Sequence, residues 1–177
     1  MMRNTNVRKL TMCAMLAAIY VVLSLAFAPI SFGAVQFRVS EALTLLPVFS
    51  PYAIVGVTVG CLITNIVGVA MGATLPLDIL FGTLATLLAA VLTYLLRNIC
   101  IKGLPVLAAL PPVLVNAFVI GWEITYFFLP EGASWVGFIT SAISVGLGQV
   151  VACCVLGLLL VYTLKKTKLD AKLFGHF

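Results

Sequence analysis

The sequence predicts an all-α membrane protein, and three observations lead to that fold class. Of its 177 residues, 63% are hydrophobic and only 8% are charged, and the mean hydropathy is +1.25. A soluble domain carries about 25% charged residues, so the main solvent of this chain is lipid. Its apolar runs are long and continuous, whereas the strands of a membrane barrel alternate polar and apolar residues. Lipid-exposed backbone has to satisfy its own hydrogen bonds, which allows only helices or a closed barrel. With the barrel excluded, the predicted fold is a helical bundle.

Six apolar segments are candidate membrane spans, and no long linker divides them into domains. Five of them approach or exceed the about 20 residues that cross a bilayer as an α-helix. These five cover residues 10–28, 52–72, 78–97, 105–128 and 134–164. The sixth, residues 39–50, is short and contains Pro47, so it is either a short span or a re-entrant segment. We therefore treat residues 1–177 as a single integral membrane domain.

Lysine and arginine predict how the chain is oriented in the membrane. With six spans and a cytoplasmic N-terminus, nine of the ten basic residues lie inside and only Arg38 lies outside. With five spans, the better orientation gives seven against three. The positive-inside rule therefore favours a six-transmembrane-helix bundle with both the N- and the C-terminus in the cytoplasm.

Small residues recur at a spacing of four in two of the predicted spans. The stripe in segment 52–72 consists of Gly56, Gly60, Thr64, Gly68 and Gly72. Small residues at this spacing let helix backbones approach closely, so we interpret the stripe as internal packing. In the first span, Ala14 and Ala18 form a similar pair. That face serves either internal packing or the docking of another membrane subunit.

The sequence carries no enzyme or metal signature. It lacks the Gly-x-x-x-x-Gly-Lys-Ser/Thr phosphate loop, so the chain does not hydrolyse ATP by that route. Its one histidine, His176, leaves no basis for a Ser–His or Cys–His nucleophile pair. The five cysteines have no zinc-like spacing. We predict a protein that is not an enzyme and that uses no metal, no cofactor and no nucleic acid.

Polar side chains beside or within the apolar spans are the candidates for binding a ligand, because charges near a bilayer core are costly and usually paired or functional. We select Gln36, Arg38, Glu41, Asp78, Asn116, Trp122, Glu123 and Gln149. Asn116 and Glu123 are seven residues apart, close to two helical turns, so they share one face. A carboxylate, an amide and an aromatic ring suit a flat heterocycle, because a guanine-like edge offers two N–H donors to a carboxylate.

Several of these residues also have a purely structural interpretation. Trp122 occupies a position typical of the aromatic belt at a membrane interface. Asn65 and Gln149 are typical of amides that hydrogen-bond between helices. For these residues the sequence leaves both interpretations open.

The charged candidates also have structural as well as ligand-binding interpretations. Asp78 opens a predicted helix, so an N-terminal cap is its simplest role. Arg38 and Glu41 are close enough in sequence to pair with each other. Glu123 has no cation near it in the sequence, and we therefore favour a ligand role for that carboxylate.

Residues 35–43, which read VQFRVSEAL and are followed by Leu46-Pro47, resemble the signature of the queuosine-precursor transporter family QueT. Members of this family are substrate-binding S-components of energy-coupling factor (ECF) transporters. The resemblance extends to the length of the chain, its six-span layout, its basic ends and its small-residue first helix.

The resemblance implies a bundle of the ECF S-component type in a bacterial plasma membrane. Such a subunit captures queuine or a related 7-deazaguanine from outside for ATP-driven uptake. Its expected partners are one transmembrane coupling protein and two ATPase subunits. Ala14 and Ala18 resemble the Ala-x-x-x-Ala motif that meets the coupling protein, and segment 32–46 is expected to form a lid over the site.

Three other functions fit parts of the same pattern. The chain is alternatively an S-component for another vitamin, such as riboflavin or thiamine. A non-transporting membrane subunit that stabilises a larger complex would account for the glycine stripe. A secondary transporter driven by an ion gradient is the third, although the chain is short for that class and has no clear inverted repeat.

Overall fold

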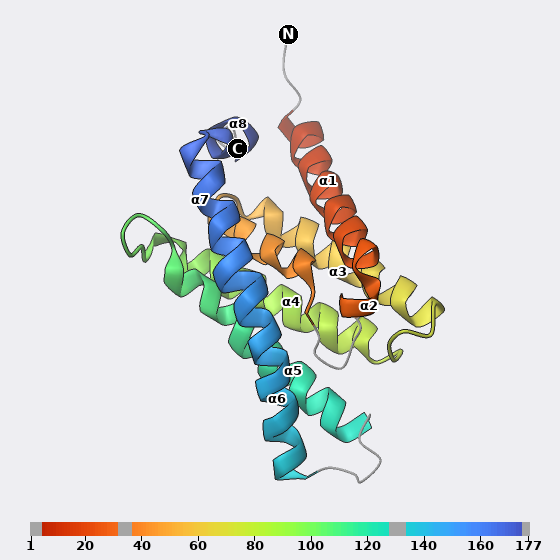
Figure 1. Cartoon of the computed structure of the whole chain (residues 1–177). Coiled ribbons are helices and arrows are strands. Elements are labelled where there is room, and N and C mark those ends of the chain that lie inside the picture. Colours follow the sequence, from red (N-terminus) through yellow and green to blue (C-terminus); the bar gives the residue numbers. More distant parts are fainter. Residues whose placement is uncertain (1–4, 32–36, 128–133, 175–177) are drawn as a thin grey trace.

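The computed structural model describes residues 5–31, 37–127 and 134–174, and helices dominate that part of the chain (Figure 1). Within it, five apolar helical stretches of 19 to 32 residues are long enough to cross a membrane. Their principal helices are α1 (Thr5–Ala26), α3 (Tyr52–Ala70), α4 (Asp78–Leu95), α5 (Leu110–Phe127) and the continuous run α6–η4–α7 (Trp135–Lys166). The prediction of five long apolar helices is confirmed.

Short elements connect and end these helices. They are α2 (Ala28–Ser31), η2 (Leu96–Asn98), η3 (Val106–Ala109) and α8 (Leu169–Phe174). A tight turn between Ile101 and Leu104 lies between η2 and η3, and Lys102 and Gly103 adopt positive φ angles of 51° and 80° there. Lys165 of α7 donates to the carbonyl oxygen of Gly103 at 2.9 Å, which ties this turn to the last long helix.

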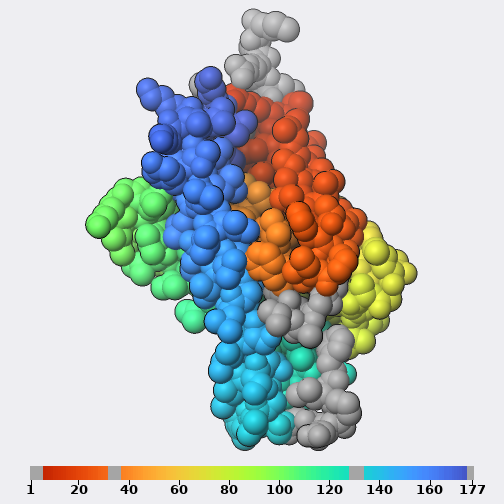
Figure 2. Space-filling model, viewed as in Figure 1, coloured from red at the N-terminus to blue at the C-terminus, as the bar shows by residue number. Residues whose placement is uncertain are grey.

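The short sixth segment forms the centre of the bundle. It is the 3₁₀-helix η1 (Val39–Val48), and every residue from Ser40 to Pro47 is buried. It contacts α1, α3, α4, α7 and η4. Part of it is visible in Figure 2, in orange, between α1 in red and the C-terminal helix in blue. At about 2.0 Å per residue its ten residues extend about 20 Å, which is farther than the same residues reach as an α-helix.

Both ends of the described chain lie at the same end of the bundle (Figure 1). The guanidinium of Arg8, near the start of α1, donates to the carbonyl oxygen of Lys172 in α8 at 2.8 Å. With five crossings alone, the start of α1 and the end of α7 would lie at opposite ends of the bundle. They lie at the same end because η1 crosses the bundle once more, between α1 and α3.

Glycine brings the long helices into close contact. A Cβ atom on Gly56 would lie 2.8 Å from Leu16 Cβ, and one on Gly60 would lie 2.7 Å from Tyr20 Cβ. No real side chain fits at those distances, so α3 can approach α1 only with glycine at both positions. The packing role that we predicted for the stripe is confirmed there. For Gly72 it is wrong, because this residue lies beyond α3 at φ +68°, and a Cβ atom added to it would have no neighbour within 4 Å among the described residues.

The last long helix contains a π-helical segment that the apolar pattern of residues 134–164 did not indicate. This segment, η4 (Val150–Gly157), lies between α6 (Trp135–Gln149) and α7 (Leu158–Lys166) and contacts η1. Cys153 Sγ lies 3.5 Å from the carbonyl oxygen of Glu41 and 3.8 Å from Thr44 Oγ1. Short π-helical insertions are often found at functional sites. In this chain the wider π-helical turn of η4 packs against η1.

Candidate functional site

A group of buried polar side chains lies where η1, α3, α4 and α5 meet. We call it the polar centre and define it as Arg38, Glu41, Asn65, Asp78 and Glu123. Each is at most 6% exposed, and Glu123 and Asn65 are fully buried. Arg38 interacts electrostatically with the carboxylates of Glu41, Asp78 and Glu123. Four of the residues predicted from sequence are therefore brought together from three parts of the chain.

Arg38 and Asn65 are held by hydrogen bonds within this centre. Arg38 Nη1 donates to Asn65 Oδ1 at 3.1 Å, and its Nε donates to the carbonyl oxygen of Ser31 at 3.4 Å. Asn65 Nδ2 donates to the carbonyl oxygen of Asp78 at 2.8 Å. Asn65 therefore links the arginine to the first turn of α4, which agrees with the prediction that it hydrogen-bonds between helices.

The carboxyl groups of Asp78 and Glu123 are neighbours across the α4–α5 contact. Both Glu123 oxygens and Asp78 Oδ2 accept no N–H donor among the described residues, and the two carboxyl groups lie within hydrogen-bonding reach of each other. Two carboxylates only accept hydrogen bonds, so they need a shared proton or an outside donor to join them. Leaving such groups without a partner costs free energy in a buried site. Their arrangement favours a ligand that supplies N–H donors.

The cap interpretation of Asp78 is wrong. Asp78 is the first residue of α4, the preceding Leu77 occupies the cap position, and no side chain makes a capping hydrogen bond there. The carboxylate is buried against α5 instead of accepting from the exposed amides of its own helix. Its position at the start of α4 thus presents it to Glu123.

Glu41 connects the polar centre to α1. Tyr20 donates its hydroxyl proton to Glu41 Oε1 at 2.5 Å, and the hydroxyls of Ser24 and Ser40 are 2.6 Å apart. Glu41 and Arg38 interact electrostatically, as the pairing alternative expected, but each also has a hydrogen-bond partner on another helix. Tyr20 was not among the residues predicted from the sequence. The available signal was a phenol within an otherwise aliphatic stretch.

Asn116 and Gln149 are buried near this level of the bundle. Asn116 lies on the same buried face of α5 as Ile120 and Glu123, so the shared face predicted from their spacing is confirmed. Its Nδ2 has no acceptor among the described residues. Gln149 ends α6, where its Oε1 lies 3.4 Å from Cys153 Sγ. That contact lies within one helix, so it is not the interhelical bond that the sequence suggested.

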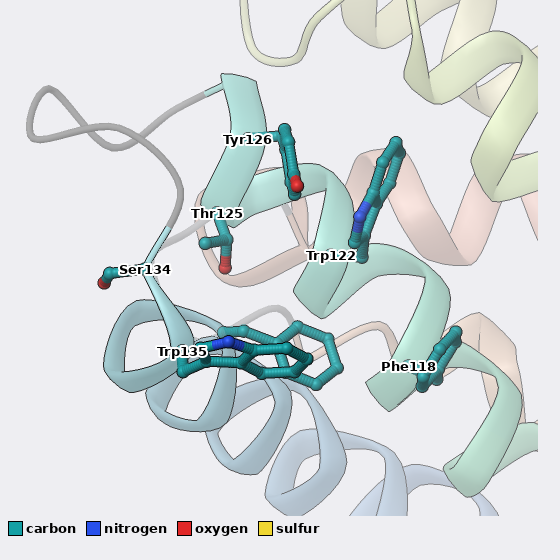
Figure 3. A pocket seen from close by; sticks show the side chains of 7 residues that line it. Phe118, Trp122, Thr125, Tyr126, Ser134 and Trp135 are labelled. Atoms are coloured by element: carbon teal, nitrogen blue, oxygen red, sulfur yellow. The ribbon is translucent and has the colours of Figure 1, made fainter.

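Trp122 lies apart from the polar centre, in what we call the aromatic cavity. This cavity of about 320 Å³ lies between α5 and α6 and is lined by Phe118, Trp122, Thr125, Tyr126, Ser134, Trp135 and Phe138. Figure 3 shows the rings of Trp122 and Tyr126 on α5 and that of Trp135 on α6. The ring centroids of Trp122 and Tyr126 are 4.7 Å apart. Because Trp135 is 83% exposed, an aromatic belt at the membrane interface explains much of this group.

Two further predictions concern Gln36 and the alanine pair. Gln36, with residues 32–35 of the expected lid, lies outside the described residues, whereas residues 39–46 of that lid belong to the buried η1. Ala14 and Ala18 are exposed on α1, whose buried face carries Leu16 and Tyr20. The alanine pair therefore does not contribute to the α1–α3 contact, which leaves docking as its remaining interpretation. Among the described residues, no group of three His, Cys, Asp or Glu side chains is placed to hold a metal.

A multi-pass helical bundle whose charged side chains meet in its interior has the structure of a membrane transport protein. The model of the QueT transporter family matches residues 10–166, and the chain belongs to that family. The resemblance noted in the sequence is thereby confirmed.

A relative gives the comparison more detail. The protein described as "Queuosine precursor transporter QueT" from Lactococcus lactis subsp. cremoris (strain MG1363) is 34% identical over 88 residues. The match covers 49% of this chain and 49% of that relative, so it spans about half the length of each. No solved structure matches the chain.

Proposed function

We propose that this chain is the substrate-binding component of an ECF-type transporter and that it captures a queuosine precursor, queuine or a related 7-deazaguanine, for ATP-driven uptake. Membership of the QueT transporter family supports the proposal, as does the description of the relative from Lactococcus lactis as a queuosine precursor transporter. The observation that carries it is Glu123, a fully buried carboxyl group that faces a second carboxyl group, Asp78, and whose oxygens accept no N–H donor among the described residues.

The chemistry of the polar centre fits a guanine-like edge. Such an edge presents two adjacent N–H donors, and a carboxylate accepts both in a bidentate arrangement. Glu123 supplies that carboxylate. Asn116 has a buried amide nitrogen with no acceptor in the described part of the chain, which suits the ring carbonyl of the same ligand. The pairing would satisfy groups that the described residues leave without partners, and hydrogen bonds to charged groups contribute about 1.5–3 kcal/mol each.

The proposed orientation places the termini in the cytoplasm and the distal ends of α5 and α6 outside. Nine of the ten basic residues then lie on or near the inner side, as the positive-inside rule requires. The tenth, Arg38, is buried and hydrogen-bonded to Asn65, so it adds little positive charge to the outer surface. In this topology η1 is the second of six crossings, which agrees with both termini lying at one end.

The proposed partners are one transmembrane coupling protein and two ATPases. The exposed pair Ala14 and Ala18 supports a docking face on α1, because small residues let a second helix approach closely. We expect Ala14→Trp and Ala18→Trp to leave ligand binding unchanged and to abolish uptake in membranes that contain the ATPase module. Uptake that survives both substitutions would place the coupling protein elsewhere.

Calorimetry of the detergent-purified chain tests the substrate directly. The ligands are queuine, the aminomethyl and cyano 7-deazaguanines, riboflavin and thiamine. We expect heat of binding with at least one deazaguanine and none with the two vitamins. Binding of riboflavin or thiamine alone would reject the substrate and leave the transporter class standing. Uptake that continues after ATP depletion would instead indicate an ion-driven transporter.

A further inference from the structure

A second cavity shares no lining residue with the polar centre and lies at the end of the bundle where the termini meet. We call it the α1–α8 groove, and its volume is about 220 Å³. Its lining consists of Arg8, Thr11, Met12, Met15, Leu16, Ile19, Lys172, Leu173 and Phe174. Pockets that enclose drug-sized ligands measure about 300–1,000 Å³, so the groove is too small for a compact ligand of that size. An extended chain fits its dimensions better.

The walls of the groove are held in place by the rest of the fold. Phe174 of α8 is buried, and its ring stacks on that of Phe49 with centroids 5.4 Å apart. The hydrogen bond from Arg8 to the carbonyl oxygen of Lys172 joins the two helices at the other side. The groove is therefore part of the folded structure and does not depend on a ligand to form it.

The groove combines a basic rim with an apolar floor. Arg8 and Lys172 provide its two cations, and the floor is formed mainly by methionine, leucine and isoleucine side chains. Met15 is 56% exposed and Ile19 is 43% exposed, so this part of α1 has no cover among the described residues. An arginine guanidinium offers several N–H donors in a geometry that matches phosphate. The basic rim is suited to bind an anionic group, and the apolar floor is suited to bind a hydrocarbon chain.

The length of the groove matches one leaflet of a bilayer. From Arg8 to Ile19 the helix rises about 16 Å at about 1.5 Å per residue. Half of a hydrocarbon core of about 30 Å is about 15 Å. A headgroup beside Arg8 would therefore place the end of its acyl chain near the bilayer midplane.

We propose that the α1–α8 groove binds one anionic phospholipid, with the phosphate of its headgroup at Arg8 and Lys172 and one acyl chain along Met15 and Ile19. Basic pockets between membrane helices recognise acidic headgroups in this way. The inference is independent of the substrate, because none of these residues belongs to the polar centre.

A coupling protein is the competing occupant. Ala14 and Ala18 each lie three residues after a lining residue of the groove, Thr11 and Met15, so the alanine pair borders the groove on α1. The charge pattern favours lipid, since a phosphate complements the two cations at the rim.

Native mass spectrometry of the purified full chain tests the proposal. Phosphatidylglycerol and phosphatidylcholine with identical acyl chains are added separately, and the retained lipid is counted. We expect one phosphatidylglycerol per chain and at least about tenfold weaker retention of phosphatidylcholine. The double variant R8Q/K172Q should retain phosphatidylglycerol about 30-fold more weakly, because each cation near the surface contributes about a factor of five.

Two further variants separate local recognition from general charge and from misfolding. K166Q/K168Q removes the same charge from the same end of the bundle, outside the groove, and should weaken retention by less than about threefold because of screening. Met15→Trp fills the floor without changing charge and should prevent retention. Thermal unfolding shows whether each variant is folded. If R8Q/K172Q does not fold, Met15→Trp decides the question.

Four outcomes would overturn the proposal. They are equal retention of the two lipids, equal losses in the two double variants, undiminished retention by Met15→Trp, and displacement of the lipid by inorganic phosphate alone. If Met15→Trp prevents assembly with the ATPase module while lipid retention is unchanged, the groove is a protein interface instead.

Discussion

The α1–α3 contact and the polar centre are both buried, but the first is made of glycine and apolar side chains and the second of charged side chains. At the α1–α3 contact, Gly56 and Gly60 let two backbones approach until apolar side chains close the interface. At the polar centre, three carboxyl groups meet one guanidinium, and several oxygens have no donor among the described residues. The first arrangement stabilises the fold, whereas the second lowers the free energy of unfolding until a ligand or proton satisfies it.

The largest expected effect comes from the polar centre. Glu123→Gln removes the charge and keeps the shape, so we expect 7-deazaguanine affinity to fall by about 1.5–3 kcal/mol, or roughly 10- to 150-fold. Thermal stability should not fall, because the substitution removes a buried carboxylate whose oxygens accept no N–H donor among the described residues. Asp170→Asn on α8 is the matched control and should change neither quantity. Calorimetry and thermal unfolding measure the two effects. A loss of stability with unchanged affinity would make Glu123 a structural residue.

The α1–α3 contact should respond in the opposite way. Gly60→Ala places a Cβ atom 2.7 Å from Tyr20 Cβ, and such overpacking costs about 1–3 kcal/mol of stability. Gly146→Ala in α6 is the control, since its Cβ atom would make an ordinary contact at 3.5 Å with Ala117 Cβ. That variant should gain up to about 1 kcal/mol from helix propensity. Equal midpoints of thermal unfolding for the two variants would show that the α1–α3 contact tolerates a larger residue.

The charge of the polar centre predicts a preference among ligands. Glu41, Asp78 and Glu123 outnumber Arg38, so a ligand with a protonated amine is favoured over a neutral one. We expect the aminomethyl 7-deazaguanine to bind about tenfold more tightly than the cyano compound, as a charge-assisted hydrogen bond replaces a neutral one. Competition calorimetry compares the two ligands on one preparation. Equal affinities would mean that the acidic groups do not contact the ring substituent.

The smallest effect is expected at the edge of the site. Trp122 lines the aromatic cavity, where its ring contacts those of Phe81 and Tyr126, and no residue of the polar centre lines that cavity. Trp122→Phe should therefore change ligand affinity by less than about threefold, or about 0.6 kcal/mol. Ligand titrations of Trp122→Phe and Glu123→Gln under the same conditions compare their losses of affinity. A loss as large as that of Glu123→Gln would join the aromatic cavity and the polar centre into one site.

Much of the polar centre could be anticipated from the sequence because charge in an apolar chain is rare. Arg38, Glu41, Asp78 and Glu123 stand out for that reason, and the structure brings them together. Their partners could not be anticipated. Tyr20 reaches Glu41 only because η1 packs against α1, and no periodic pattern records a contact between those two segments.

Two backbone features were also hidden from the sequence pattern. The hydrophobicity of residues 39–50 indicated an apolar helix but not its 3₁₀ winding or its central position. Hydrophobicity of residues 134–164 likewise indicated one long helix, whereas the π-helical segment η4 depends on its contact with η1. In both cases apolar residues are distributed around the segment, so their spacing does not distinguish an α-helix from a 3₁₀- or π-helix.

The sequence by itself determined the membrane class, the long helices and the family, because hydropathy, helix length and a short motif are properties of consecutive residues. The tertiary structure alone decided that Asp78 faces Glu123, that Tyr20 is bound to Glu41, and that Trp122 lies outside the polar centre. Each of these relations joins residues on different helices, and they depend on how closely glycine and η1 allow those helices to approach.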